Sequence, residues 1–196
     1  MAFSAMFVVM FSFTFIFLGV VDALPEPALS RVSNGIKVPQ EAVVATEPEL
    51  PVRVEVRGVG VNATVSNPNS TNVNTLDQAL TKGAVRYPTS AQLGEVGTVL
   101  LFGHSSYLPV VYNKAYQAFN EIGKLEKGDI VSVYSSTLEY RYRVMSVEVA
   151  DASEDVIELP QEGKRLILVT CDTFTKKSSR FIVRAEFVGT YPLASN

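Results

Sequence analysis

The 196-residue sequence has only one cysteine, Cys171, and only one histidine, His104. A single cysteine excludes a disulfide within the chain, so the fold is not stapled by disulfides. Basic residues are not in excess, since 17 Lys and Arg stand against 20 Asp and Glu. The chain therefore has no basic stripe, and we expect no nucleic-acid partner. Its length and 47% hydrophobic content suit one domain with a sizeable core.

Charge is also missing from the N-terminal segment. No charged side chain occurs from Ala2 to Val21, and Asp22 ends the run. An apolar helix of this length spans about 30 Å, the thickness of a hydrocarbon core. This favours a membrane-spanning signal anchor at residues 1–21. A cleaved signal peptide stays open, because Val21 to Ala23 loosely fits a cleavage site. A buried helix is disfavoured, since no polar face interrupts the run. We expect a single-pass protein of the cell membrane whose remaining residues lie outside the cytoplasm.

The residues after the apolar run divide into a linker and a folded domain. Residues 22–50 contain the acidic, Pro-rich stretches "DALPEPAL" and "TEPELP", which are typical of an extracytoplasmic linker. Residues 51–196 carry the periodic patterns of a folded domain. Strand-like runs are "VRVEVRGVGV", "NATV", "GTVLLFGHS", "GDIVSVYSS", "EYRYRVMSVEVA", "KRLILVTC" and "RFIVRAEFVG".

The helical signals in this domain are few and short. Thr75 to Gly83 predicts one helix, with Asn74 or Thr75 as its N-cap. The spacing of Tyr116, Phe119 and Ile122 predicts a second helix. About eight strands with two short helices and no βαβ rhythm indicate a mostly-β fold, a closed or nearly closed barrel without exposed edges.

His104 and Cys171 each follow an apolar strand, and Arg180 begins the strand after the loop "DTFTKKSS". Two antiparallel strands joined by such a loop place the end of one beside the start of the next. Cys171 and Arg180 should therefore meet at one rim of the barrel. His104 joins them if its strand lies in the same sheet and points the same way.

These three residue types suit nucleophilic catalysis. A lone extracytoplasmic thiol is a buried inert residue, an intermolecular disulfide or a reactive nucleophile. Beside His104 and Arg180 we expect the nucleophile, because nearby cations favour the thiolate. His104 would protonate a leaving amine, and Arg180 would donate to the oxyanion of a tetrahedral intermediate.

The motifs resemble those of the sortase family. "ILVTC" followed by "RFIVRA" is similar to the sortase signature Thr-Leu-X-Thr-Cys with its downstream Arg, and "LFGHSS" is similar to the catalytic-His segment. "VRVEVRGVGVNATV" and "LTKGAVRYPTSAQLGEVGTVLLFGHSS" extend the similarity, which covers about Pro51 to Thr190. Ile167 replaces the first Thr of the signature. By register with the family pattern, Arg180 rather than Arg184 is the active arginine.

The resemblance implies a sortase-like, closed eight-stranded β-barrel from a bacterium, with Cys171, His104 and Arg180 as catalytic residues and Thr170 beside the substrate. It implies cleavage of a Leu-Pro-X-Thr-Gly sorting signal on secreted proteins through a thioacyl intermediate. An amine from a cell-wall precursor or a pilin lysine would resolve that intermediate. Alternatives are a cysteine hydrolase and a non-catalytic peptide-binding barrel. L,D-transpeptidases are more distant, because their Ser-X-Gly-Cys pattern is missing.

No metal or organic cofactor is implied by the resemblance, although some sortases use calcium. Asp151, Glu154 and Asp155 are a weak calcium candidate, and a solvated turn is the better interpretation.

Overall fold

The computed structural model describes residues 43, 47–106, 109–151, 157–172 and 179–193, with only the backbone of Cys171 and Asp172. The predicted apolar helix at residues 1–21 and most of the predicted linker lie outside these residues. Within the described ranges, none of the helices combines the length and the hydropathy that a membrane crossing requires.

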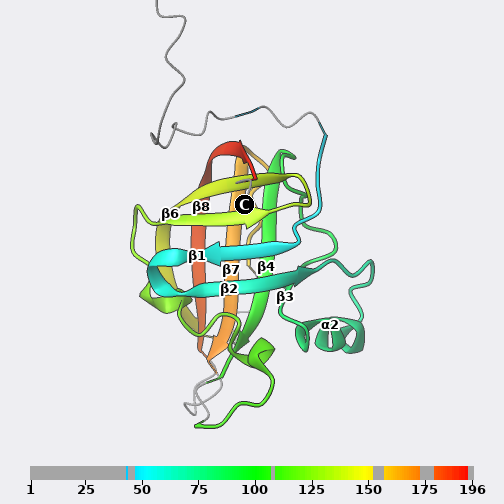
Figure 1. The fold of residues 1–196 in the computed structure, drawn as a ribbon, viewed down its shortest axis with the longest axis vertical. Coiled ribbons are helices and arrows are strands. Elements are labelled where there is room, and N and C mark those ends of the chain that lie inside the picture. The colour runs from blue at the N-terminus through cyan, green and yellow to red at the C-terminus, as the bar shows by residue number, and fades with distance from the viewer. Residues whose placement is uncertain (1–42, 44–46, 107–108, 152–156, 173–178, 194–196) are drawn as a thin grey trace, which may run out of the picture. The chain divides into compact units, whose positions relative to one another are not determined.

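The described residues form a closed barrel of eight strands, in the order β1-β2-β3-β4-β7-β8-β6-β5 (Figure 1). The strands are β1 (Arg53–Val56), β2 (Val61–Ser66), β3 (Ala84–Arg86), β4 (Gly97–Ser105), β5 (Ile130–Tyr134), β6 (Leu138–Asp151), β7 (Lys164–Asp172) and β8 (Ser179–Pro192). The helical elements are η1 (Arg57–Val59), α2 (Val73–Leu80), η2 (Lys114–Gln117) and η3 (Ile122–Lys124). The mostly-β barrel with short helices is confirmed.

Side-chain alternation explains how the strands build two separate apolar layers. In β1 and β2, every second residue is buried in the barrel core, as the period-two patterns predict. The apolar residues of β4 and β7 instead alternate between two layers. Leu101 and Leu168 belong to the barrel core, whereas Leu100, Ile167 and Val169 form a smaller cluster with Ile182 of β8. The unbroken apolar runs of β4 and β7 therefore fill both the interior and a covered outer face.

Two strand pairs of the described barrel are parallel. β2 pairs with β3 through the crossover that contains α2, and β4 pairs with β7 over nine residues from Gly97–Lys164 to Ser105–Asp172. A parallel pair needs a long connection, which α2 and the β5–β6 hairpin provide here. The β4–β7 pairing satisfies the condition set by the sequence, that the strand leading to His104 points the same way as the strand leading to Cys171.

The helices differ in detail from the sequence predictions. α2 begins two residues earlier than predicted, because the Oδ1 atom of Asn72 accepts a hydrogen bond from the backbone N–H of Asn74. The predicted second helix is instead two short 3₁₀ turns, η2 and η3. Tyr116, Phe119 and Ile122 recur every three residues, which matches a helix of about 3.0 residues per turn better than one of 3.6.

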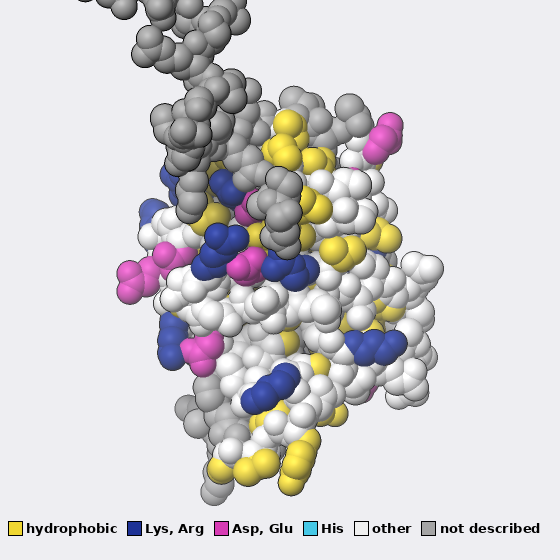
Figure 2. All heavy atoms as spheres, in the orientation of Figure 1, with side chains coloured by type: hydrophobic (Ala, Val, Ile, Leu, Met, Phe, Trp, Pro, Cys, Tyr) yellow, Lys and Arg dark blue, Asp and Glu magenta, His cyan; other side chains and the backbone are white. Residues whose placement is uncertain are grey.

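The outer face of β1, β5 and β6 is covered by charged side chains of both signs, which lie beside one another in Figure 2. Arg53 and Arg57 both form ion pairs with Glu55, at 2.8 and 3.0 Å. On the neighbouring strands, Arg141 forms an ion pair with Glu139 at 2.8 Å. On this face three arginines are therefore paired with two glutamates.

The chain already contacts the barrel before Pro51. The backbone N–H of Val43 donates to the carbonyl of Thr190 at 2.7 Å, and Glu49 exchanges two 2.9 Å backbone hydrogen bonds with Leu93. The carboxylate of Glu49 also accepts hydrogen bonds from Thr137 and, at 2.9 Å, from Tyr140. A domain boundary at residue 51 stays a prediction, but the described contacts of the barrel reach back to Val43.

Candidate active site

Three adjacent strands bring the backbones of the predicted site residues into one row. In the parallel β4–β7 pair His104 lies opposite Cys171, and in the antiparallel β7–β8 pair Cys171 lies opposite Arg180. Neighbouring strands are about 4.8 Å apart, so the row spans about 10 Å. Each of the three residues is one position from an end of its strand. His104 and Cys171 are the next-to-last residues of β4 and β7, and Arg180 is the second residue of β8. The sequence patterns predicted that the strands end before His104 and Cys171. The pairing of β4 with β7 extends through both residues.

The end of β4 is held in place by the 3₁₀ segment that follows it. The backbone N–H of Phe119 donates to the carbonyl of His104 at 3.0 Å. The ring of Phe119 packs directly on Gly103, where a Cβ atom would lie 3.0 Å from the ring. Glycine at this position therefore allows a fully buried aromatic ring to cover the strand immediately before His104.

The imidazole of His104 is half-buried and lies against the ring of Tyr116 from η2. The two ring centroids are 5.0 Å apart, with an interplanar angle of 34°. Burial lowers the pKa of His104 below its ordinary value of 6.5, and the negative charge of Asp77 on α2 offsets part of this effect. Burial therefore favours the neutral imidazole, which is the form that accepts a proton.

Arg180 faces the same site from β8 with an unsatisfied donor. Its Nε atom is buried and has no hydrogen-bond partner among the described residues. A buried guanidinium donor without a partner costs free energy unless a ligand completes it. Arg184 differs, because its Nε atom lies 3.8 Å from Glu148 and it is paired across the sheet with Ile167 and Ser146. It lies four residues, about 13 Å, farther along β8.

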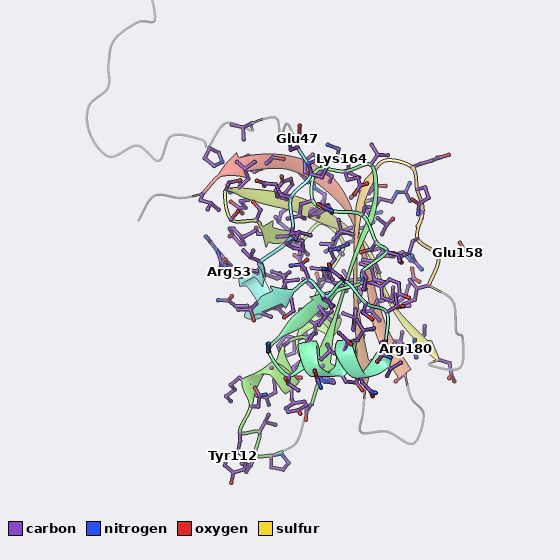
Figure 3. All side chains as sticks on the ribbon, turned by 90° about the vertical axis from the view of Figure 1, so that its right-hand side faces the viewer. Glu47, Arg53, Tyr112, Glu158, Lys164 and Arg180 are labelled. Atoms are coloured by element: carbon purple, nitrogen blue, oxygen red, sulfur yellow. The ribbon has the colours of Figure 1, made fainter. Side chains whose placement is uncertain are left out.

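A cavity of about 400 Å³ runs beside this row, with His104, Thr170 and Arg180 among its lining residues. Its apolar lining comes from α2, β4, β7 and the segment before β7, and consists of Leu76, Leu80, Leu100, Phe102, Ile157 and Val169. In Figure 3, α2 lies across the end of the barrel at which Arg180 is labelled. We call this cavity the groove.

Tyr87 completes the groove on the side of β3. Its ring contacts Phe102 edge-on, with centroids 6.5 Å apart. The preceding residue, Arg86, is buried, and its Nη1 atom donates to the carbonyls of Tyr87 at 3.2 Å and Ser90 at 2.5 Å. These hydrogen bonds fix the turn that presents Tyr87 to the groove.

A comparison with models of known protein families shows to which family the chain belongs. A family model described as the sortase domain matches residues 54–188. The chain belongs to the sortase family. Sortase A of Bacillus anthracis is 31% identical over 116 residues, which cover 58% of this chain and 51% of that protein. Sortase D of Bacillus subtilis (strain 168) is 31% identical over 97 residues, covering 49% and 44%. The chain thus spans about half the length of the curated relatives it matches.

Solved sortase structures share the fold. Sortase A of Listeria monocytogenes superposes with a TM-score of 0.58 at 26% identity, covering 76% of this chain and 93% of that chain. Sortase C of Streptococcus pneumoniae gives a TM-score of 0.59 at 19% identity, covering 76% and 74%. The second likeness supports the fold alone.

In this sortase the structure adds residues to the site that the sequence did not indicate. Asp77 and Leu76 reach the groove from α2. Tyr116, which entered the sequence analysis only as part of a predicted helix, lies on His104. The signal for Tyr116 is its spacing of three from Phe119, which places both on one side of the 3₁₀ segment. No comparable signal exists for Asp77, because its position depends on how the β2–β3 crossover lies on the barrel.

The calcium candidate receives no support from the described residues. Asp151 ends β6 and is exposed, while Glu154 and Asp155 lie outside the description. Within the described ranges, no group of three His, Cys, Asp or Glu residues is placed to hold a metal ion.

Proposed function

We propose that this chain is a cysteine transpeptidase in which Cys171 is the nucleophile, His104 the acid and base, and Arg180 the oxyanion donor. The observation that carries the proposal is the single row of His104, Cys171 and Arg180 on three adjacent strands beside the groove. Membership of the sortase family supports it. The proposed reaction cleaves a Leu-Pro-X-Thr-Gly-type signal between Thr and Gly and transfers the acyl part to an amine.

The first half-reaction follows from these roles. The thiol of Cys171 gives its proton to the neutral imidazole of His104, and the resulting thiolate attacks the carbonyl carbon of the substrate threonine, so that negative charge develops on the carbonyl oxygen. Arg180 donates to that oxygen with a guanidinium that stays charged. The C–N bond then breaks, and the glycine amine leaves with the proton that His104 carries. A thioester on Cys171 remains.

The second half-reaction reverses the proton transfer. The acceptor amine gives a proton to His104 as its nitrogen attacks the thioester carbonyl. The C–S bond breaks, an amide forms, and Cys171 returns as thiolate beside protonated His104. The lowered pKa of His104 suits this step, because a neutral imidazole is available near pH 7 to receive the proton.

The groove supports an extended, largely apolar substrate. Six apolar side chains line it next to Thr170, which is buried at the end of β7. An apolar lining with few polar groups is typical of sites that take a peptide side chain of the same character. We propose that the Leu-Pro part of the signal lies on this apolar lining and that Thr170 contacts the substrate.

The cellular setting is proposed from the sequence. An apolar segment at residues 1–21 would anchor the protein in the cell membrane, and the linker would hold residues 51–196 outside the cytoplasm. Partners would be secreted proteins that carry the sorting signal, and an amine of a cell-wall precursor or a pilin.

The proposal is tested by trapping the thioester. The full-length protein is incubated with a Leu-Pro-X-Thr-Gly peptide, and its intact mass is measured with and without a glycine or diaminopimelate amine. We expect an acyl adduct on the parent protein, transfer product when amine is present, and neither species for Cys171→Ala. Circular dichroism of the variant checks that the barrel still folds.

Two outcomes contradict the proposal. Cleavage by Cys171→Ala at the parental rate excludes Cys171 as the nucleophile. An adduct that is released only as the free acid, at every amine concentration, identifies a cysteine hydrolase instead.

A further inference from the structure

Asp77 is the one acid among the described residues that line the groove. It lies in the second half of α2, it is exposed, and its carboxylate forms no hydrogen bond or ion pair with a described residue. The other titratable groups of known position in the groove are Tyr87, His104 and Arg180. An anion that faces the site without a partner is available to a ligand.

The carboxylate is close enough to His104 for its charge to act on the imidazole, since it offsets part of the effect of burial there. Both residues belong to one cavity wall that α2 and β4 share. The C-terminal end of α2 is attached to the segment that follows β4. Asn72 caps its first turn, and the Nδ2 atom of Asn113 donates to the carbonyl of Thr81 at 2.8 Å. The helix is thereby tied to the segment whose Tyr116 lies on His104.

The donor peptide offers no cation to Asp77. A Leu-Pro-X-Thr-Gly signal has no obligatory charged side chain, so the first half-reaction leaves the carboxylate unused. The acceptor does carry the complementary charge. A primary alkyl amine is an ammonium ion at neutral pH and must lose a proton before it attacks. An anion next to the residue that removes this proton would hold the acceptor where the transfer occurs.

We propose that Asp77 binds the acceptor as its ammonium ion and holds it beside His104. The inference rests on the proposed transpeptidase function. The ammonium gives one proton to the neutral imidazole, and the free amine then forms the C–N bond. As the C–S bond to Cys171 breaks, a second proton passes from the nitrogen to the leaving sulfur, so Cys171 returns as the thiol beside protonated His104. Asp77 itself neither gains nor loses a proton. The accepted class is a primary amine that is protonated in solution.

The test compares a charged acceptor with a neutral one on the same thioester. The full-length protein is loaded with the sorting peptide, and transfer is followed against the concentration of a lysine-type amine or of hydroxylamine, which is uncharged at about pH 7.5. For Asp77→Asn we expect the KM for the lysine-type amine to rise about two- to fivefold, the scale of losing one exposed ion pair. The preference for the charged over the neutral acceptor should fall by the same factor.

Glu158→Gln is the matched control. Glu158 is an exposed acid next to Ile157 of the groove, but it is not among the lining residues, and Figure 3 shows it at the outer side of the barrel. Removal of its charge should leave the preference for the charged acceptor unchanged. Asp77→Glu, which keeps the charge, should retain most of that preference.

The outcomes separate this inference from the function on which it rests. If the parent protein forms no thioester, the transpeptidase proposal fails. If the thioester forms and Asp77→Asn keeps the parental KM for the charged amine, Asp77 does not bind the acceptor. An equal loss with both acceptors also overturns the inference, because it shows that Asp77 acts on His104 and not on the ammonium.

Discussion

Charged residues behave differently on the outer face of β1, β5 and β6 and in the groove. On the outer face, which we call the paired face, the charged residues Arg53, Glu55, Arg57, Glu139 and Arg141 all have ion-pair partners. The aromatic residues there take part as well. The guanidinium of Arg53 lies 3.8 Å from the ring centroid of Tyr134, and that of Arg141 lies 4.0 Å from Tyr191.

The carboxylates of the paired face respond to their partners. Burial raises the pKa of Glu55. Hydrogen bonds from Arg57, Tyr134 and Arg53 together lower it by more, so the pKa lies below its ordinary value. The pKa of Glu139 is lowered in the same way, because hydrogen bonds from Arg141 and Ser132 outweigh burial. These groups are satisfied within the protein and have little left to offer a ligand.

The groove shows the opposite condition. Among the described residues, Arg180 has a buried Nε donor without a partner, and the carboxylate of Asp77 has no hydrogen bond or ion pair. Burial disfavours the charged form of His104. Charged side chains thus form ion pairs within the protein on the paired face, whereas in the groove they are available to bind a substrate. The comparison teaches that a buried charged donor without a described partner, and not charge itself, marks the candidate site.

The largest effect is expected from the unpaired arginine. Arg180→Ala should slow formation of the Cys171 thioester about a hundredfold or more, because it removes an oxyanion donor. Rapid-quench kinetics with the sorting peptide measure this rate. Arg184→Ala is the control, since Arg184 lies on the same strand as Arg180 but faces Glu148 of β6. An equal loss from Arg184→Ala would reverse the assignment of the two arginines.

A smaller and different effect is expected from the paired face. Arg141→Leu should lower the free energy of unfolding by about 1 kcal/mol, because Glu139 loses its ion pair while it stays buried. Thioester formation should not change. Urea denaturation checks the stability. Arg143→Leu, two residues along β6 at an exposed position without a described partner, should have almost no effect. Equal destabilisation by both variants would mean that the pairing is not what stabilises this face.

The smallest effect is a shift in titration. His104 is the only histidine, so its imidazole resonance in a proton NMR spectrum needs no assignment. Its midpoint should lie below 6.5 in the folded protein, because burial disfavours the imidazolium, and should move lower still in Asp77→Asn. The unfolded chain then binds this proton more tightly than the folded one, so acidification through 6.5 reduces stability. A midpoint at 6.5 in both proteins would show that neither burial nor Asp77 acts on the imidazole.

Much of the barrel could be predicted from local patterns. Period-two alternation located β1, β2, β5 and β6, and the apolar runs located β4 and β7. The three residues of β3 are too few to carry a period, so no pattern could locate that strand. The parallel β4–β7 pair was stated only as a condition, because pairing between strands more than sixty residues apart depends on the whole topology and not on neighbouring residues.

The site was predictable where chemistry and strand ends coincide. Cys171, His104 and Arg180 are rare or special residue types at strand ends, and the register aligns their backbones as expected. Asp77 carries no such signal, since an aspartate on a short exposed helix is ordinarily a solvated residue. The groove also required the fold, because its lining combines side chains from α2, β4, β7 and β8.

Glu49 determines how far this protein can be shortened from its N-terminal side. Its carboxylate accepts a hydrogen bond from the hydroxyl of Tyr140, a fully buried side chain, and its backbone forms two hydrogen bonds with Leu93. A truncated form that started at Pro51 would cut away the acceptor of a core tyrosine as well as this short ladder. A shortened protein should therefore start before Val43. It then keeps the contacts of Glu49 and also the hydrogen bond from Val43 to Thr190.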